Sequence, residues 1–137
     1  MVNPETIRRR LNKLDDYLEL LERSQRYTQK EFTADPERYG SAERFLHLAI
    51  ETLNDIANHV VADQRLGPVE QYSDLPRLFA EQSWIDHSQK ELWTRMIGFR
   101  NILVHDYLDV DHQIVYDVLQ NNLGDLRALR SAFARFL

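Results

Sequence analysis

Apolar residues in the N-terminal half recur at intervals of three and four positions, the spacing of one face of an α-helix. The first series predicts a long amphipathic helix that begins at Asn3-Pro4-Glu5, an N-cap followed by proline and an acid, and ends near Gln29. The connector Phe32-Thr33-Ala34-Asp35-Pro36 offers a second start of this kind, so we expect a second long helix from there to about Arg65, before Leu66-Gly67-Pro68. The apolar positions that define the two faces are Ile7, Leu11, Leu14, Leu18 and Leu21, then Phe45, Leu48, Ala49, Leu53, Ile56, Ala57 and Val60.

The C-terminal half is also predicted to be helical. A short helix is expected at 74–82, and a capping box at Ser88-x-x-Glu91 should open a helix that carries Leu92, Met96 and Ile97. Asp111 should cap a last helix that reaches Phe133, weakened locally by Gly124. No segment alternates at period two, so no sheet is expected. We therefore predict an all-α fold, an up-and-down helical bundle of about four long helices plus one short helix, in a single domain over residues 1–137.

The apolar pattern leads from Leu92 into the stretch Gly98 to Tyr107, where side chains suited to phosphate chemistry gather. Arg100 is a permanent planar cation, and His105 can take or give a proton near neutral pH. Asn101 and His105 are four residues apart and share a helix face, whereas Arg100 and His105 are five apart and do not on a regular helix. The helical pattern fades after His105, so we place this residue at the helix C-terminus, where the chain can bend its ring toward Arg100.

These groups match the needs of RNA cleavage without a metal. A base removes the 2′-hydroxyl proton, an acid protonates the leaving 5′-oxygen, and a cation stabilises the charge on the phosphoryl oxygens. One His105 and one Arg100 are too few for this chemistry. A two-fold dimer that brings the motifs together would supply two of each.

The composition restricts the function further. Hydrophobic residues make up 43% of the chain, enough for a core, whereas the net charge of −5 argues against broad, non-specific nucleic-acid binding. No cysteine is present for disulfides or thiolate metal sites, and no apolar run approaches the ~18 residues of a membrane span. The N-terminus lacks the apolar core of a signal peptide. We expect a cytoplasmic protein that does not associate with membranes.

Two further groups of polar residues leave alternatives open. Arg8, Arg9 and Arg10 form either a solvated face of the first helix or a contact surface for RNA or a partner. Glu51, Asp55 and His59 are spaced as a stripe on one helix face, and pairing along the helix explains them better than metal binding, because the chain has no Glu-x-x-His. In a third interpretation, polar residues here line a cleft opposite the motif; the candidates are Asn58 and His59. We expect no metal and no cofactor.

The stretch from Arg100 to Tyr107 resembles the Arg-x4-His signature of HEPN domains, and in the form Arg-Asn-x-x-x-His-x-Tyr it resembles the HepT toxin family. The segment Leu48 to His59 is similar to that family's second helix, and length and helix order match. The resemblance implies the HEPN fold and a metal-independent endoribonuclease, the toxin of a type VII-like toxin–antitoxin pair, with a 2′,3′-cyclic phosphate product. It implies a homodimer in which Arg100 holds phosphate, His105 transfers protons, and Asn101 orients the histidine or the substrate.

Tyr107 occupies the position that is modified in HepT-like systems, two residues past the histidine. There the partner is a minimal nucleotidyltransferase antitoxin that adds AMP to this tyrosine. Added negative charge at the mouth of a phosphate-binding cleft would repel RNA. The structural alternative for Tyr107 is a ring packed against its own loop.

Other functions remain open at this point. Arg100 and His105 could cap the helix and pair with acids, as in a purely structural helical dimer. Another possibility is a non-catalytic HEPN module that binds nucleotide or assists a nucleotidyltransferase. Some HEPN proteins have this role after losing the Arg-His pair, so the intact pair favours the enzyme.

Overall fold

The computed structural model describes residues 3–137, apart from the side chain of Tyr107, and this part of the chain is helical with no strand. The predicted all-α class is therefore confirmed. The elements are α1 (Pro4–Ser24), α2 (Gln29–Ala34), α3 (Pro36–Gln64), α4 (Asp74–Glu81), α5 (His87–His105), α6 (His112–Asn121) and α7 (Leu123–Phe133), with the 3-10 helices η1 (Tyr107–Asp109) and η2 (Ala134–Phe136).

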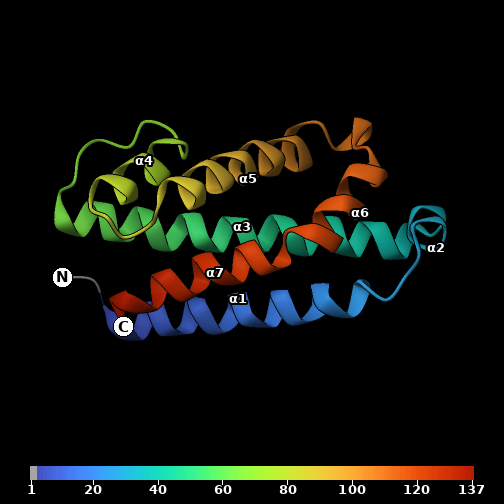
Figure 1. Cartoon of the computed structure of the whole chain (residues 1–137), viewed down its shortest axis with the longest axis horizontal. Helices are drawn as coiled ribbons and strands as arrows, with labels where there is room; N and C mark the ends of the chain where they lie inside the picture. Colours follow the sequence, from blue (N-terminus) through green and yellow to red (C-terminus); the bar gives the residue numbers. More distant parts are fainter. Residues whose placement is uncertain (1–2) are drawn as a thin grey trace.

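Four helices form an up-and-down bundle along the long axis of the molecule (Figure 1). The chain direction alternates from α1 to α3, α5 and α7, and α1 packs on α3 and α7 while α5 packs on α3. At one end α2 joins α1 to α3 and packs against α6, and at the other end α4 packs on α3 and α5. None of the helices in the described range is long and apolar enough to span a membrane.

The apolar face predicted for α1 is buried as expected, because its five residues point into one core cluster with the apolar faces of α3, α5 and α7. Phe79, Trp93 and Phe133 form the aromatic centre of this cluster, with ring centroids 5.1 to 5.3 Å apart. Burial of such side chains contributes roughly 1.5–3 kcal/mol each. The indole nitrogen of Trp93 donates to Asn54 Oδ1 at 2.9 Å, which ties α5 to α3 inside the core.

The helix boundaries in the N-terminal half differ from the prediction. The first helix ends at Ser24 and not near Gln29, because Thr28 starts a new helix with its own capping box: the Thr28 side chain accepts from the Glu31 N–H, and the Glu31 carboxylate accepts from the Thr28 N–H. Most of the expected connector at 32–36 is therefore helix α2. The second long helix begins at Pro36 and ends at Gln64 as expected, with Arg65 in the left-handed conformation at φ 54°.

Two boundaries in the C-terminal half also differ. The capping box of α5 is formed by Asp86 and Gln89, so Ser88 lies inside the first turn and is not the cap. The expected last helix is divided into α6 and α7 at Asn122, which leaves helical geometry at φ −118° and ψ 0°. Its side-chain amide donates to Asp125 at 2.9 Å, and this local bond stabilises the break before Gly124 is reached.

Candidate active site

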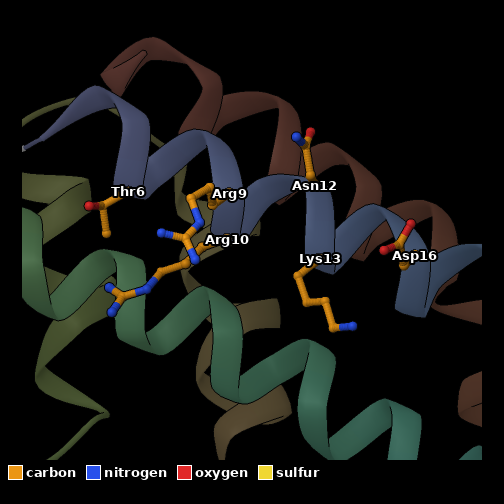
Figure 2. A pocket seen from close by; sticks show the side chains of 6 residues that line it. All are labelled: Thr6, Arg9, Arg10, Asn12, Lys13 and Asp16. Atoms are coloured by element: carbon orange, nitrogen blue, oxygen red, sulfur yellow. The ribbon is translucent and has the colours of Figure 1, made fainter.

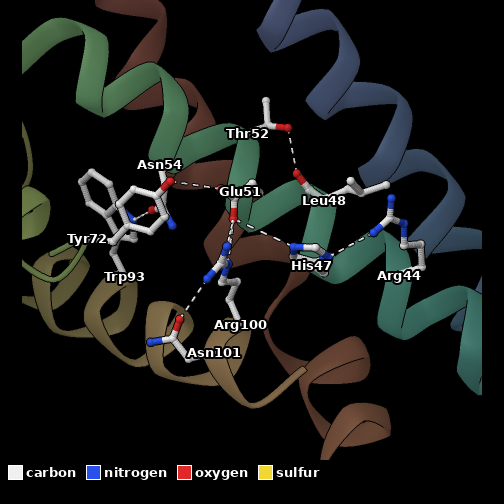
Figure 3. Close-up of polar contacts among 10 residues, drawn as sticks. All are labelled: Arg44, His47, Leu48, Glu51, Thr52, Asn54, Tyr72, Trp93, Arg100 and Asn101. Atoms are coloured by element: carbon white, nitrogen blue, oxygen red, sulfur yellow. Dashed lines mark hydrogen bonds and ion pairs between the residues drawn. The ribbon is translucent and has the colours of Figure 1, made fainter. Parts of the chain in front are cut away.

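The centre of the candidate site is an ion pair between Arg100 on α5 and Glu51 in the middle of α3 (Figure 3). The Nε and Nη2 atoms of Arg100 both contact Glu51 Oε2, at 2.7 and 2.6 Å. The two side chains are only 16% and 24% exposed, so this pair is weakly screened by solvent. The contact fixes the position of the guanidinium against α3.

Tyr72, in the segment between α3 and α4, holds the other side of the carboxylate. Its hydroxyl donates to Glu51 Oε1 at 3.1 Å, and its ring lies 5.6 Å from the guanidinium carbon of Arg100. Burial and the nearby charge of Glu51 raise the pKa of the Tyr72 hydroxyl, so the hydroxyl stays a donor at neutral pH. Both oxygens of Glu51 thus have a partner, and the cation also has an aromatic contact.

Asn101 contacts Arg100 directly. Its Oδ1 accepts a hydrogen bond from Arg100 Nη1 at 3.1 Å, so the amide orients the arginine. The role of Asn101 in orienting the histidine or the substrate, which the resemblance implies, stays a prediction. A guanidinium carries five N–H groups, and three of them are engaged by Glu51 and Asn101. Each terminal nitrogen therefore keeps one N–H that can bind a phosphate oxygen.

His105 is the last residue of α5, as predicted, and it is exposed. It forms no hydrogen bond or ion pair within the part of the chain that the structure describes, while the Asp106 N–H closes the helix by donating to the Ile102 carbonyl at 2.9 Å. The alternative in which both motif residues pair with acids thus holds for Arg100 and not for His105. The backbone of Tyr107 starts η1 immediately afterwards, and its side chain lies outside the described residues.

A second imidazole belongs to the same network. His47, one turn before Glu51 on α3, lies with Nε2 3.9 Å from Glu51 Oε2, and its Nδ1 is 3.4 Å from Arg44 Nη1. Burial and the positive charge of Arg100 lower the pKa of His47. His47 is therefore neutral at pH 7, a polar group beside the arginine that the sequence did not single out.

Glu51, Asp55 and His59 are not among any group of three or more histidine, cysteine or acidic side chains arranged to hold a metal ion, since no such group is found in the described residues. Glu51 faces Arg100, and Asp55 is one turn further along α3, where burial and Glu51 raise the pKa of its carboxyl. Asn58 and His59 are exposed; Asn58 borders a hollow beside Tyr72, and His59 borders another beside Arg10. Their role as cleft residues stays a prediction.

The arginines near the start of α1 separate into two groups. Arg8 pairs with Glu5 at 3.1 Å, the local pairing expected of a solvated face. Arg9, Arg10 and Lys13 line a hollow along α1, and Arg10 reaches toward α3 (Figure 2). The positive charges of Arg10 and Arg100 both lower the pKa of Asp55, against the larger effects of burial and Glu51 that raise it.

Glu51 and Tyr72 are the site residues whose roles the sequence did not reveal. One signal was available: Glu51 interrupts the apolar run in the middle of α3, where a charged side chain needs a partner to be half buried. The sequence does not show which residue is the partner, because Arg100 is 49 residues away along the chain.

Known proteins share the sequence pattern and the fold of this chain. The model of the family described as "Ribonuclease HepT-like" matches residues 14–133. An mRNA nuclease HepT of Shewanella oneidensis is 36% identical over 80 residues, an alignment that covers 58% of this chain and 60% of that relative. The chain thus matches less than two thirds of this curated relative's length.

Solved structures match over nearly the whole chain. A tri-AMPylated Shewanella oneidensis HEPN toxin in complex with an MNT antitoxin has a TM-score of 0.85 at 26% identity and covers 96% of this chain and 97% of its own. A toxin–antitoxin structure with AMP-PNP has a TM-score of 0.84 at 25% identity and covers 97% and 99%. The resemblance seen in the motif is confirmed, and this chain belongs to the HepT-like ribonuclease family.

Proposed function

We propose that this protein is a metal-independent endoribonuclease, the toxin of a type VII-like toxin–antitoxin pair, and that it acts in the cytoplasm as a homodimer. The observation that carries the proposal is the state of the two motif residues. Arg100 is held by Glu51 with one free N–H on each terminal nitrogen, and His105 is exposed and has no acidic partner in the described structure. Family membership and the nuclease named among the relatives support the same activity.

The reaction needs a base, an acid and a cation around one phosphate. In the dimer, neutral His105 removes the 2′-hydroxyl proton, and the 2′-oxygen attacks the phosphorus while the bond to the 5′-oxygen breaks. The partner subunit's His105, protonated, gives its proton to the leaving 5′-oxygen. Arg100 binds the phosphoryl oxygens as their charge increases, and Asn101 keeps the guanidinium in place. The products are a 2′,3′-cyclic phosphate and a 5′-hydroxyl.

Exposed apolar side chains next to the motif support a dimer at this place. Ile102 on the last turns of α5, Leu108 in η1 and Ile114 at the start of α6 are 47%, 83% and 52% exposed. A second copy of the chain that covers them brings the two motifs together. In such a dimer, each copy of the single domain at 1–137 contributes half of the catalytic groups.

We further propose that a minimal nucleotidyltransferase antitoxin neutralises the protein by adding AMP to Tyr107. Support comes from the position of Tyr107, two residues past His105 at the start of η1. Further support comes from a solved relative, which is a tri-AMPylated HEPN toxin in complex with an MNT antitoxin. Each added phosphate competes with RNA for Arg100.

The proposal is tested by incubating the purified protein with total RNA in EDTA. Cleavage is expected to persist, and the 3′ ends of the products should carry a 2′,3′-cyclic phosphate or its opened form. Loss of cleavage in EDTA with full rescue by a divalent ion would contradict the histidine mechanism. Nucleotide binding without any RNA cleavage would point instead to a non-catalytic helical module.

A further inference from the structure

A small hollow borders Asn101, next to the contacts that hold Arg100. One face of α5 lines it with Thr94, Ile97, Gly98 and Asn101, and the segment before α4 lines it with Gln71, Tyr72 and Ser73. Its cavity volume is about 290 Å³. Pockets for drug-sized ligands occupy roughly 300–1,000 Å³, so this hollow has room for one small planar group.

Gly98 is the residue that keeps the hollow open. A Cβ placed on Gly98 would meet no other atom within 4 Å, so the glycine is not required by close packing. Glycine in a helix interior destabilises the helix relative to alanine. The helix therefore carries a destabilising residue at a position where any side chain would extend into the hollow.

The lining offers the chemistry that recognises a nucleobase. The side-chain amides of Gln71 and Asn101 each present a donor and an acceptor, and Tyr72 presents an aromatic ring. Asn101 Oδ1 accepts from Arg100, and its amide nitrogen has no partner within the described part of the chain. Proteins recognise unstacked RNA bases through hydrogen bonds to their edges and through stacking on aromatic side chains.

We propose that the hollow formed around Gly98 binds the base of a nucleotide that flanks the phosphate held by Arg100. This inference rests on the proposed function and adds to it a base-binding subsite. Asn101 connects the two places, since the same side chain contacts Arg100 and lines the hollow. A phosphate on Arg100 therefore brings an adjacent base within reach of Gln71 and Tyr72.

The test uses binding and does not depend on cleavage. RNA trinucleotides with 2′-O-methyl groups, which cannot undergo attack by the 2′-oxygen, are compared with the same trinucleotides lacking one base. Stacking of one base is worth ~1–3 kcal/mol, so the parent protein should bind the base-containing forms at least about fivefold more tightly at one position. In Gly98→Leu, the leucine fills the hollow, so the ratio of the affinity for the base-containing form to that for the form lacking the base should fall to about one.

Gly124→Leu is the matched control, because Gly124 also lies in a helix with nothing within 4 Å of its Cβ, and it is outside the hollow. The control should keep the parent's ratio. Gln71→Ala is a second variant outside any helix and should lower the ratio in part. Thermal unfolding checks that Gly98→Leu is folded.

The result that overturns the subsite is a parent protein that binds both forms equally, or a Gly98→Leu variant that keeps the parent's ratio. Nuclear magnetic resonance shifts of the Gly98 amide should respond to the base-containing form alone. Failure of the proposed nuclease is a separate result: a protein that discriminates the base but cleaves no RNA would retain the subsite and lose the reaction.

Discussion

Arg100 and Glu51 lie 49 residues apart in the chain, and the arginine contacts one oxygen of the glutamate with two of its nitrogens, at 2.7 and 2.6 Å. The pair connects the helix that carries the motif to the central helix of the bundle. In the proposed reaction Glu51 does not contact the reacting phosphate; it positions Arg100, the cation that binds it.

Replacement of Glu51 by glutamine should separate the two roles of Arg100. The amide keeps the shape but removes the negative charge, so Arg100 should attract phosphate more strongly while being held less firmly. We expect a lower KM for RNA together with a fall in kcat of about tenfold to a hundredfold, because small misplacements of a catalytic group are costly. Steady-state cleavage of a short RNA measures both constants. Glu81→Gln, which removes an exposed partner of Arg77, is the control.

The two motif residues should differ in what their removal does to stability. His105→Ala removes an exposed side chain and should change the free energy of unfolding by no more than about 0.5 kcal/mol. Arg100→Ala leaves the half-buried Glu51 without its cation and should cost roughly 1–3 kcal/mol. Both variants should lose RNA cleavage. Urea denaturation gives the difference, and equal stability of the two variants would mean that the pair with Glu51 contributes nothing.

His47 should make the protein less stable as the pH falls. Its pKa is lowered in the folded state by burial and by Arg100, so the unfolded chain takes up a proton first, near pH 6.5. The contribution of neutral His47 to the free energy of unfolding is complete above that pH. It is lost as the pH decreases through the lowered pKa of the folded state. Comparing urea denaturation of the parent and His47→Gln at pH 7.5 and 5.5 isolates this contribution. The parent should lose more stability than the variant over this interval.

Dimerisation should depend on the apolar residues next to the motif. Leu108→Glu places a charge on a side chain that is 83% exposed, so it should not disturb the monomer fold but should prevent burial against a second copy. We expect a monomer in analytical ultracentrifugation and loss of RNA cleavage. Leu137→Glu changes an exposed leucine elsewhere and should leave the dimer intact. A Leu108→Glu variant that remains dimeric would place the interface on another surface.

Tyr107→Phe should keep RNA cleavage and escape modification. Phenylalanine keeps the ring but offers no hydroxyl for AMP transfer. With the nucleotidyltransferase partner and ATP, the parent should gain one or more AMP units and bind RNA more weakly, while the variant should show neither change. Intact-mass measurement detects the added AMP. Full modification of the variant would identify another acceptor residue.

The fold class followed from apolar spacing, because the faces of α1, α3, α5 and α7 are set by residues close together in sequence. Helix ends were less predictable. At α5, Asp86 and Ser88 are both acceptable caps, and the reciprocal bonds with Gln89 decided between them. At Asn122 the chain breaks one helix into two, although a continuous apolar pattern runs through it.

The candidate site was predictable where its residues are neighbours in the chain. Arg100, Asn101 and His105 were identified from spacing and family resemblance, and the structure places His105 at the end of α5 as expected. For Glu51, the sequence predicts pairing along its own helix. Nothing local in a sequence specifies which distant cation a half-buried acid will meet, since that contact is set by the packing of α3 against α5.

The buried side chains of α5 all precede Gly98, so the turns that carry the motif are joined to the body of the protein by polar and half-buried contacts. The backbone amides of this helix should therefore form two populations in hydrogen exchange. Those before Gly98 exchange through global unfolding, and those after it exchange through local fraying of the helix end. We therefore expect the segment that carries the motif to open and close on its own timescale while the core of the bundle stays closed.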